Sequence, residues 1–164
     1  MRNAMSAKNK MIAENPHSVP GSGIVSCLKV PDQPSISKRA ARRLIQRAIV
    51  LTGRDRSVRQ HIREVRIATL WVLEDWNLEW TVNLDRGRVR FDRRPTRAPD
   101  LTLTWPNAEE FFTNIQEGRT PDDSLAVEGD PELRTYVDPV YRSFCRSLEG
   151  VIKYPFDDAE NPLM

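Results

Sequence analysis

The residues that could do chemistry are few in this chain, and their spacing does not bring them together. Nucleophilic catalysis needs a serine or cysteine within reach of a base, but His17 lies in a proline-rich leader and His61 in an arginine-rich segment. Cys27 and Cys145 are far apart in the sequence and lack the spacing of metal ligands. The histidines and cysteines therefore predict no catalytic site, no metal site and no cofactor.

Adjacent carboxylates occur at four places. Neighbouring residues on a helix or strand point in different directions, so adjacent acids do not form a natural acid/base dyad. Residues 21–23, Gly-Ser-Gly, lack the lysine and the strand–loop–helix context of a phosphate-binding loop. We expect solvated acids and helix caps at the four pairs, which are Glu74 with Asp75, Glu109 with Glu110, Asp122 with Asp123, and Asp157 with Asp158.

An alternating pattern at residues 76–92 is typical of two strands that are buried on one face. Apolar side chains occupy every second position of residues 76–84, with polar side chains between them. The turn sequence Asp-Arg-Gly follows at residues 85–87, with the glycine where the backbone needs a positive φ. Residues 88–92 alternate again, so the sequence predicts a hairpin with one apolar face.

A further strand and a helix follow the hairpin. Residues 101–105 alternate between apolar side chains and threonine. Asn107 and Glu110 have the spacing of a capping box, and Gly118 is a helix stop signal. We therefore predict a strand over residues 101–105 and a helix that ends before Gly118.

The C-terminal third predicts a short strand and two helices. Leu125 and Val127 have the spacing of one strand face. Asp130, followed by a proline at the first helical position, predicts the start of one helix. Apolar residues at helical spacing predict a second helix that begins beyond Pro139 and reaches Gly150.

Helices are also predicted before the sheet. Ser37 is expected to cap an amphipathic helix that ends at Gly53, and Ser57 a second, shorter one, before a first strand at residues 67–73. The first helix has a strongly basic face, which consists of Lys38, Arg39, Arg42, Arg43 and Arg47.

This ordered set of segments resembles the sterol carrier protein type 2 (lipid-transfer) family. The segments that carry the resemblance are residues 80–89, 98–104, 108–112, 118–119 and 127–130. Their order is similar to the family's strand, turn, strand, strand, helix and final Gly-Asp before a helix. The resemblance implies an α+β fold in two layers, with a five-stranded, mainly antiparallel sheet that helices cover on one face. It also implies a hydrophobic tunnel between the layers for a fatty-acyl chain, a sterol or another lipid.

The resemblance implies an apolar lining rather than a fixed catalytic motif. Three tryptophans on one sheet face would narrow or close such a tunnel. The predicted lining consists of Trp71, Leu73, Trp80, Val82, Phe91, Leu101, Leu103, Trp105, Phe111, Phe112, Ile115, Leu125, Val127, Tyr136, Val140 and Phe144. The predicted surface for an anionic membrane or an acidic protein partner consists of Arg39, Arg42, Arg43 and Arg47.

The composition predicts one globular domain with a leader and a tail. The chain has 164 residues, of which 39% are hydrophobic and 29% charged, and it lacks a run of about 18 apolar residues that would span a membrane. We expect an irregular leader at residues 1–36, a lipid-binding domain at residues 37–150 and an acidic tail at residues 151–164. With no secretory signal at the start, the expected location is the cytoplasm.

The charges are unevenly distributed along the chain. Residues 38–66 hold ten basic residues against two acidic ones, whereas residues 99–164 hold fourteen acidic residues against five basic ones. This pattern fits either an anionic surface as partner or pairing of the two ends within the fold. Nucleic acid is not expected, because the aromatic residues occupy the apolar columns instead of alternating with the arginines as a stacking platform.

Three functions remain open from the sequence. The first, which we expect, is binding and carrying or presenting a hydrophobic ligand. The second is a bacterial accessory protein or small enzyme that acts on a hydrophobic intermediate, and it would need an acid such as Asp85, Asp100 or Glu128 inside the cavity. The third is a structural adaptor whose pocket is filled by aromatic rings.

Overall fold

The apolar columns of the sequence form one face of a five-stranded sheet. The computed structural model describes residues 35–95 and 97–164, so the expected leader lies outside the described residues except for its last two positions. The strand order is β3-β2-β1-β4-β5, in which β1 and β4 are parallel and all other neighbours antiparallel. The strands are β1 (Arg66–Leu73), β2 (Leu78–Asp85), β3 (Arg88–Asp92), β4 (Leu101–Trp105) and β5 (Ala126–Gly129).

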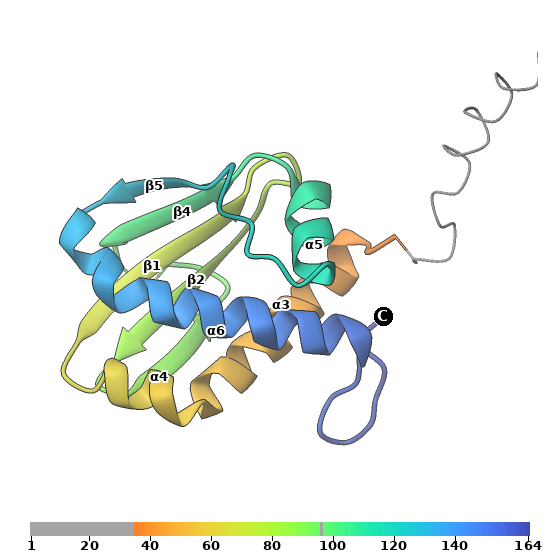
Figure 1. The fold of residues 1–164 in the computed structure, drawn as a ribbon, viewed down its shortest axis with the longest axis horizontal. Helices are drawn as coiled ribbons and strands as arrows, with labels where there is room; N and C mark the ends of the chain where they lie inside the picture. Colours follow the sequence, from red (N-terminus) through yellow and green to blue (C-terminus); the bar gives the residue numbers. More distant parts are fainter. Residues whose placement is uncertain (1–34, 96) are drawn as a thin grey trace, which may run out of the picture. The chain divides into compact units, whose positions relative to one another are not determined.

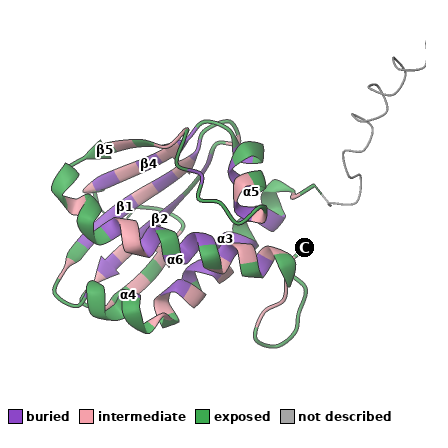
Figure 2. Ribbon diagram, in the orientation of Figure 1, coloured by how far each residue is buried: buried purple, intermediate pink, exposed green. Residues whose placement is uncertain are grey.

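Helices cover one face of this sheet (Figure 1). Helix α6 crosses the sheet, α3 packs against α6 and β3, and α5 packs against α6. Buried residues follow the strands and the inward faces of the helices (Figure 2), which confirms the predicted α+β fold. The helices are α3 (Lys38–Arg54), α4 (Arg56–His61), α5 (Ala108–Gln116) and α6 (Arg134–Lys153), with a 3-10 turn, η3 (Pro131–Leu133), before α6.

Side-chain caps set the starts of three helices. Ser37 Oγ accepts a hydrogen bond from Ala40 N at 3.1 Å at the start of α3, as predicted. Asn107 caps α5 in the same way, also as predicted. Helix α4 was predicted, but its predicted cap, Ser57, was wrong, because the cap is Asp55, whose carboxylate accepts from Ser57 N at 2.9 Å.

Asp55 also joins α4 to α6. Its second carboxylate oxygen accepts a hydrogen bond from Ser143 Oγ at 2.8 Å. Hydrogen bonds from Ser57 and Ser143 lower the pKa of Asp55, because they stabilise its ionised form. Asp55 reaches both helices because it stands at the turn between α3 and α4, opposite the middle of α6.

The C-terminal helix is continuous through Pro139, where the sequence predicted two helices. A proline inside a helix removes one N–H donor and leaves the carbonyl four residues earlier without its partner. That carbonyl is the one of Thr135, and His61 Nε2 donates to it at 3.0 Å. A contact from α4 therefore replaces the missing helical bond, and α6 runs on past Gly150 to Lys153.

None of the helices within residues 35–95 and 97–164 combines the length and the apolar character needed to cross a bilayer.

Two glycines offer a matched test of this backbone. Gly129 has a φ of +122°, and a Cβ there would lie 2.3 Å from the carbonyl oxygen of Asp100, whereas a Cβ at Gly150 meets nothing within 4 Å. We expect G129A to lower the free energy of unfolding by about 2 kcal/mol or more. We expect G150A to raise it by about 0.5–1 kcal/mol, because alanine is the better helix former. Urea unfolding of both variants would measure the changes, and equal effects would contradict this assignment of strain.

Candidate ligand-binding groove

Most of the predicted lining residues lie between the sheet and the helices. Register places Trp71 opposite Trp80 on β2 and Leu103 on β4, all on the face that the helices cover. Phe91, Leu125 and Val127 are only partly buried. Tyr136 is not part of this interior, because it is 38% exposed and lies beside His61. The buried members are Trp71, Leu73, Trp80, Val82, Leu101, Leu103, Trp105, Phe111, Phe112, Ile115, Val140 and Phe144.

Aromatic rings occupy the centre of this interior, where the tunnel was expected. The ring centroid of Trp71 lies 4.9 Å from that of Phe144, in an edge-to-face arrangement, and 5.8 Å from that of Trp105. Tyr141, which the sequence did not single out, lies 5.8 Å from both tryptophans. A ligand in this place would have to separate rings that are already in contact.

Burial makes the polar groups of this interior poor acids. Burial raises the pKa of Tyr141 above its ordinary value, and it raises the pKa of the Cys145 thiol to about 12. A thiol with this pKa stays protonated at neutral pH and is a weak nucleophile. The two side chains therefore belong to the core and offer no catalytic group.

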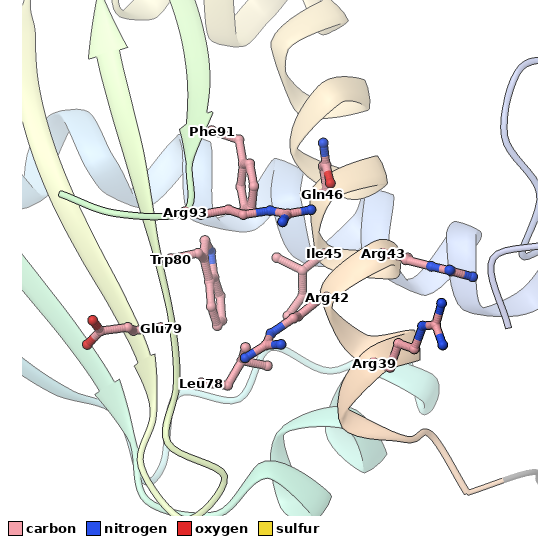
Figure 3. Close-up of a pocket in the computed structure, with 10 residues that line it drawn as sticks. All are labelled: Arg39, Arg42, Arg43, Ile45, Gln46, Leu78, Glu79, Trp80, Phe91 and Arg93. Carbon is pink, nitrogen blue, oxygen red and sulfur yellow. The ribbon is translucent and has the colours of Figure 1, made fainter. Parts of the chain in front are cut away.

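A groove of about 470 Å³ lies near the β3 edge of the sheet, between α3 and strands β2 and β3 (Figure 3). Strand β3 ends at Asp92, opposite Thr81, so residues 78–80 of β2 have no ladder partner on that side within residues 35–95 and 97–164. The short third strand thus leaves open the space that a longer one would fill. The lining consists of Arg39, Arg42, Arg43, Ile45, Gln46, Leu78, Glu79, Trp80, Phe91 and Arg93.

The floor of the groove is apolar and comes from three elements. Leu78 and Trp80 are on β2, Phe91 is on β3 and Ile45 is on α3. Leu78, Trp80 and Ile45 are buried, whereas Phe91 is half-buried at the open side. Trp80 and Phe91 belong to the predicted lining, but Ile45, Leu78 and the position of the groove were not predicted. The signal that marks it is the length difference between β2 and β3.

The rim of the groove is basic. Figure 3 shows Arg42 and Arg93 extending into the gap between α3 and the sheet, whereas Arg39 and Arg43 lie on the other side of the helix. The carboxylate of Glu79 points away from the gap, beyond β2. Within residues 35–95 and 97–164, no carboxylate lies within 4.0 Å of any of the four guanidinium groups.

One buried donor beside the groove, the indole N–H of Trp80, has no acceptor among the described residues. Trp71 Nε1 donates to Thr69 Oγ1 at 2.8 Å, and Trp105 Nε1 donates to the carbonyl of Pro121 at 2.8 Å. Trp80 Nε1 has no hydrogen-bond partner among the described residues, although Trp80 is 2% exposed. Buried N–H groups are nearly always paired, so this indole is an exception within the described part of the chain.

Arg47, the fourth arginine of the predicted basic surface, is already paired. The carboxylate of Asp158 accepts from Arg47 at 2.7 Å and from Arg54 at 2.8 Å. Asp158 stands in a C-terminal loop that Asp157 shapes by accepting from the backbone of Ala159 and Asn161. This contact joins the basic helix to the acidic end, as one of the two interpretations of the charge distribution predicts.

Asp85, Asp100 and Glu128, the candidate acids for catalysis, lie elsewhere. Asp85 faces Arg66 at 3.4 Å. Asp100 accepts hydrogen bonds from Ala68 N and Arg97. Glu128 is exposed on β5. None of the three lines the groove, so the arrangement suits binding better than acid/base chemistry.

The search for similar proteins gives structural matches alone. No protein-family model matches the sequence, and no curated protein matches it either. The solved structures that match include a conserved hypothetical protein of Thermus thermophilus, described as a possible sterol carrier protein, at 9% identity and a TM-score of 0.49 over 73% of this chain and 90% of that one.

Two further matches are sterol carrier proteins. One is a crystal structure of sterol carrier protein 2, at 11% identity and a TM-score of 0.47 over 65% of this chain and 93% of that one. The other is the apo form of sterol carrier protein 2 from Yarrowia lipolytica, at 13% identity and a TM-score of 0.41 over 70% and 95%. Identities and TM-scores this low leave the function to be inferred from the chain's own residues.

The Asp158 contact predicts how the C-terminal loop responds to mutation and to pH. Hydrogen bonds from Arg54 and Arg47 lower the pKa of Asp158. Because the folded pKa is below the unfolded one, the contact is complete above about pH 3.9, the ordinary value for aspartate, and is lost as the pH falls through the lowered pKa. A nuclear magnetic resonance titration of the Asp158 carboxylate would follow this loss.

We expect D158N to speed amide hydrogen exchange in residues 155–163 at neutral pH, because the loop loses its attachment to α3. The control is D123N, which removes an exposed carboxylate that takes part in no ion pair among the described residues. Equal exchange in the two variants would contradict a role for Asp158 in holding the loop.

Proposed function

We propose that this protein binds a hydrophobic ligand, such as an acyl chain, a sterol or an isoprenoid-like lipid, in the groove between α3 and strands β2 and β3. The observation that carries the proposal is the apolar floor of Ile45, Leu78, Trp80 and Phe91 in a groove of about 470 Å³. Ligand pockets have volumes of about 300–1,000 Å³ and combine apolar side chains with a few polar groups that orient the ligand. The resemblance of the sequence to lipid-transfer domains supports the same class of ligand.

The groove suits a ligand better than the centre of the interior does. Aromatic pairs contribute about 0.5–1.5 kcal/mol beyond the area they bury, and a ligand beside Trp71 would break several such pairs. In the groove, by contrast, a ligand can cover the half-buried Phe91 without separating these ring pairs, and each Å² of apolar surface that it covers contributes about 25 cal/mol. We therefore place the ligand at the edge of the sheet.

Carrying the ligand is the proposed role, rather than converting it. The groove offers arginines, a glutamine and an indole, but the carboxylate of Glu79 points away from it. General acid–base catalysis needs a group within hydrogen-bond reach of the reacting atom. In this proposal the protein holds a ligand, or presents it to a partner that does the chemistry.

An adaptor role is the second candidate, and the filled interior favours it. Rings in mutual contact at Trp71, Trp105 and Tyr141 make a solid core, and the exposed Arg39 and Arg43 would then serve an acidic protein partner. The adaptor needs no occupant in the groove. Ligand binding by the purified protein therefore separates the two roles.

Phe91 provides the test. We expect F91S to weaken the binding of a fluorescent fatty acid about tenfold, because burying a phenylalanine side chain contributes about 1.5–3 kcal/mol and about 1.4 kcal/mol corresponds to tenfold. The matched control is V89S, on the same strand and face but outside the groove, and we expect it to leave the affinity within about twofold.

Native mass spectrometry of the purified protein gives an independent measurement. A bound lipid that is present in the wild type and depleted in F91S supports the proposal. A protein that is always empty and takes up no fluorescent fatty acid overturns it and leaves the adaptor.

A further inference from the structure

We infer that the ligand of this groove carries an anionic head group of the phosphate type, which Arg42 and Arg93 bind from opposite sides. This inference rests on the proposed function, because it names the polar end of the same ligand. The observation behind it is that two guanidinium groups without a carboxylate partner among the described residues face one groove with an apolar floor.

The positions of the two arginines follow from their elements. Arg42 precedes Ile45 by three residues and Gln46 by four, so the three share one face of α3. Arg93 follows the end of β3 and, by alternation, returns to the face of Phe91. Figure 3 shows both side chains in the gap, one from the helix and one from the strand side.

The polar groups of the groove are mainly donors. A guanidinium group only donates hydrogen bonds, and so does an indole N–H. The indole N–H of Trp80 is buried and has no partner among the described residues, and Gln46 is the one lining side chain that can both donate and accept. The polar part of a fitting ligand must therefore accept hydrogen bonds and carry negative charge.

Charge favours phosphate over carboxylate. Two arginines supply two positive charges, which a carboxylate neutralises by half, whereas a phosphate monoester carries about −1.5 to −2 at neutral pH. The planar guanidinium fork also matches phosphate oxygens through paired hydrogen bonds. An alkyl phosphate combines this head group with an apolar chain for the floor.

The test compares four probes by isothermal titration calorimetry with the full-length protein: decyl phosphate, decanoate, decanol and inorganic phosphate. We expect decyl phosphate to bind at least tenfold more tightly than decanol, with decanoate between them. We expect R42Q and R93Q each to weaken decyl phosphate by about 10- to 100-fold, the range for hydrogen bonds to charged groups, and to leave decanol unchanged.

R94Q is the matched control. Arg94 directly follows Arg93, is exposed and carries the same charge, but it does not line the groove. We expect R94Q to leave the affinity for decyl phosphate within about twofold. If R94Q weakens binding as much as R93Q does, general attraction to the basic surface explains the data and the inference is overturned.

The four probes separate the inference from the function on which it rests. Equal affinity for decyl phosphate and decanol overturns the head-group inference and leaves the hydrophobic site intact. Inorganic phosphate that binds as tightly as decyl phosphate supports the anion site but overturns the apolar one. No binding by any probe overturns both. Circular dichroism melting of each variant would verify that these exposed substitutions leave the fold unchanged.

Discussion

The contact between Trp71 and helix α6 determines the spacing between the sheet and this helix. Trp71 stands on β1, the central strand, with Trp80 opposite it on β2, and Trp105 lies on β4 two residues beyond Leu103, the β4 residue opposite Trp71. Its ring meets Phe144 edge to face at 4.9 Å. Aromatic side chains of this size fix how closely a helix can approach a sheet. The rings therefore keep the sheet and the helix apart and also fill the space between them.

The filled centre explains why the open space lies at the edge. A close-packed interior leaves few voids larger than a water molecule, so room for a ligand has to come from the ends of elements. Here it comes from β3, which stops opposite Thr81 while β2 continues to Leu78. Helix α3 spans the resulting gap and places apolar side chains inward and arginines at the rim.

Much of the fold could be predicted because strands β2, β3 and β4 follow a period of two and the caps of α3 and α5 are residues that favour this position. Alternation at residues 76–84 gave β2 its inner face, and Ser37 and Asn107 began their helices as predicted. Pro139 misled the prediction, because the contact that lets α6 continue comes from His61, which is 74 residues away in sequence from Thr135. Long-range partners of this kind leave no local pattern.

The site could be predicted only in its residue types. Trp80 and Phe91 belong to the apolar columns, and Arg42 to the basic face of its helix, but no sequence pattern showed that they meet in one place. That meeting depends on where β3 ends and on the direction of side chains such as Arg93. It also depends on the rings of Trp71 and Trp105 closing the centre.

The early end of β3 has a second consequence, which concerns solubility. Among the residues that the structure describes, residues 78–80 of β2 lack a neighbouring strand on one side. Unpaired strand edges are places where another chain can add by backbone pairing. Natural sheets protect such edges with positively charged side chains, and Arg42 and Arg93 stand beside this one. We therefore expect a variant that lacks both charges to associate with itself more readily than the natural protein does.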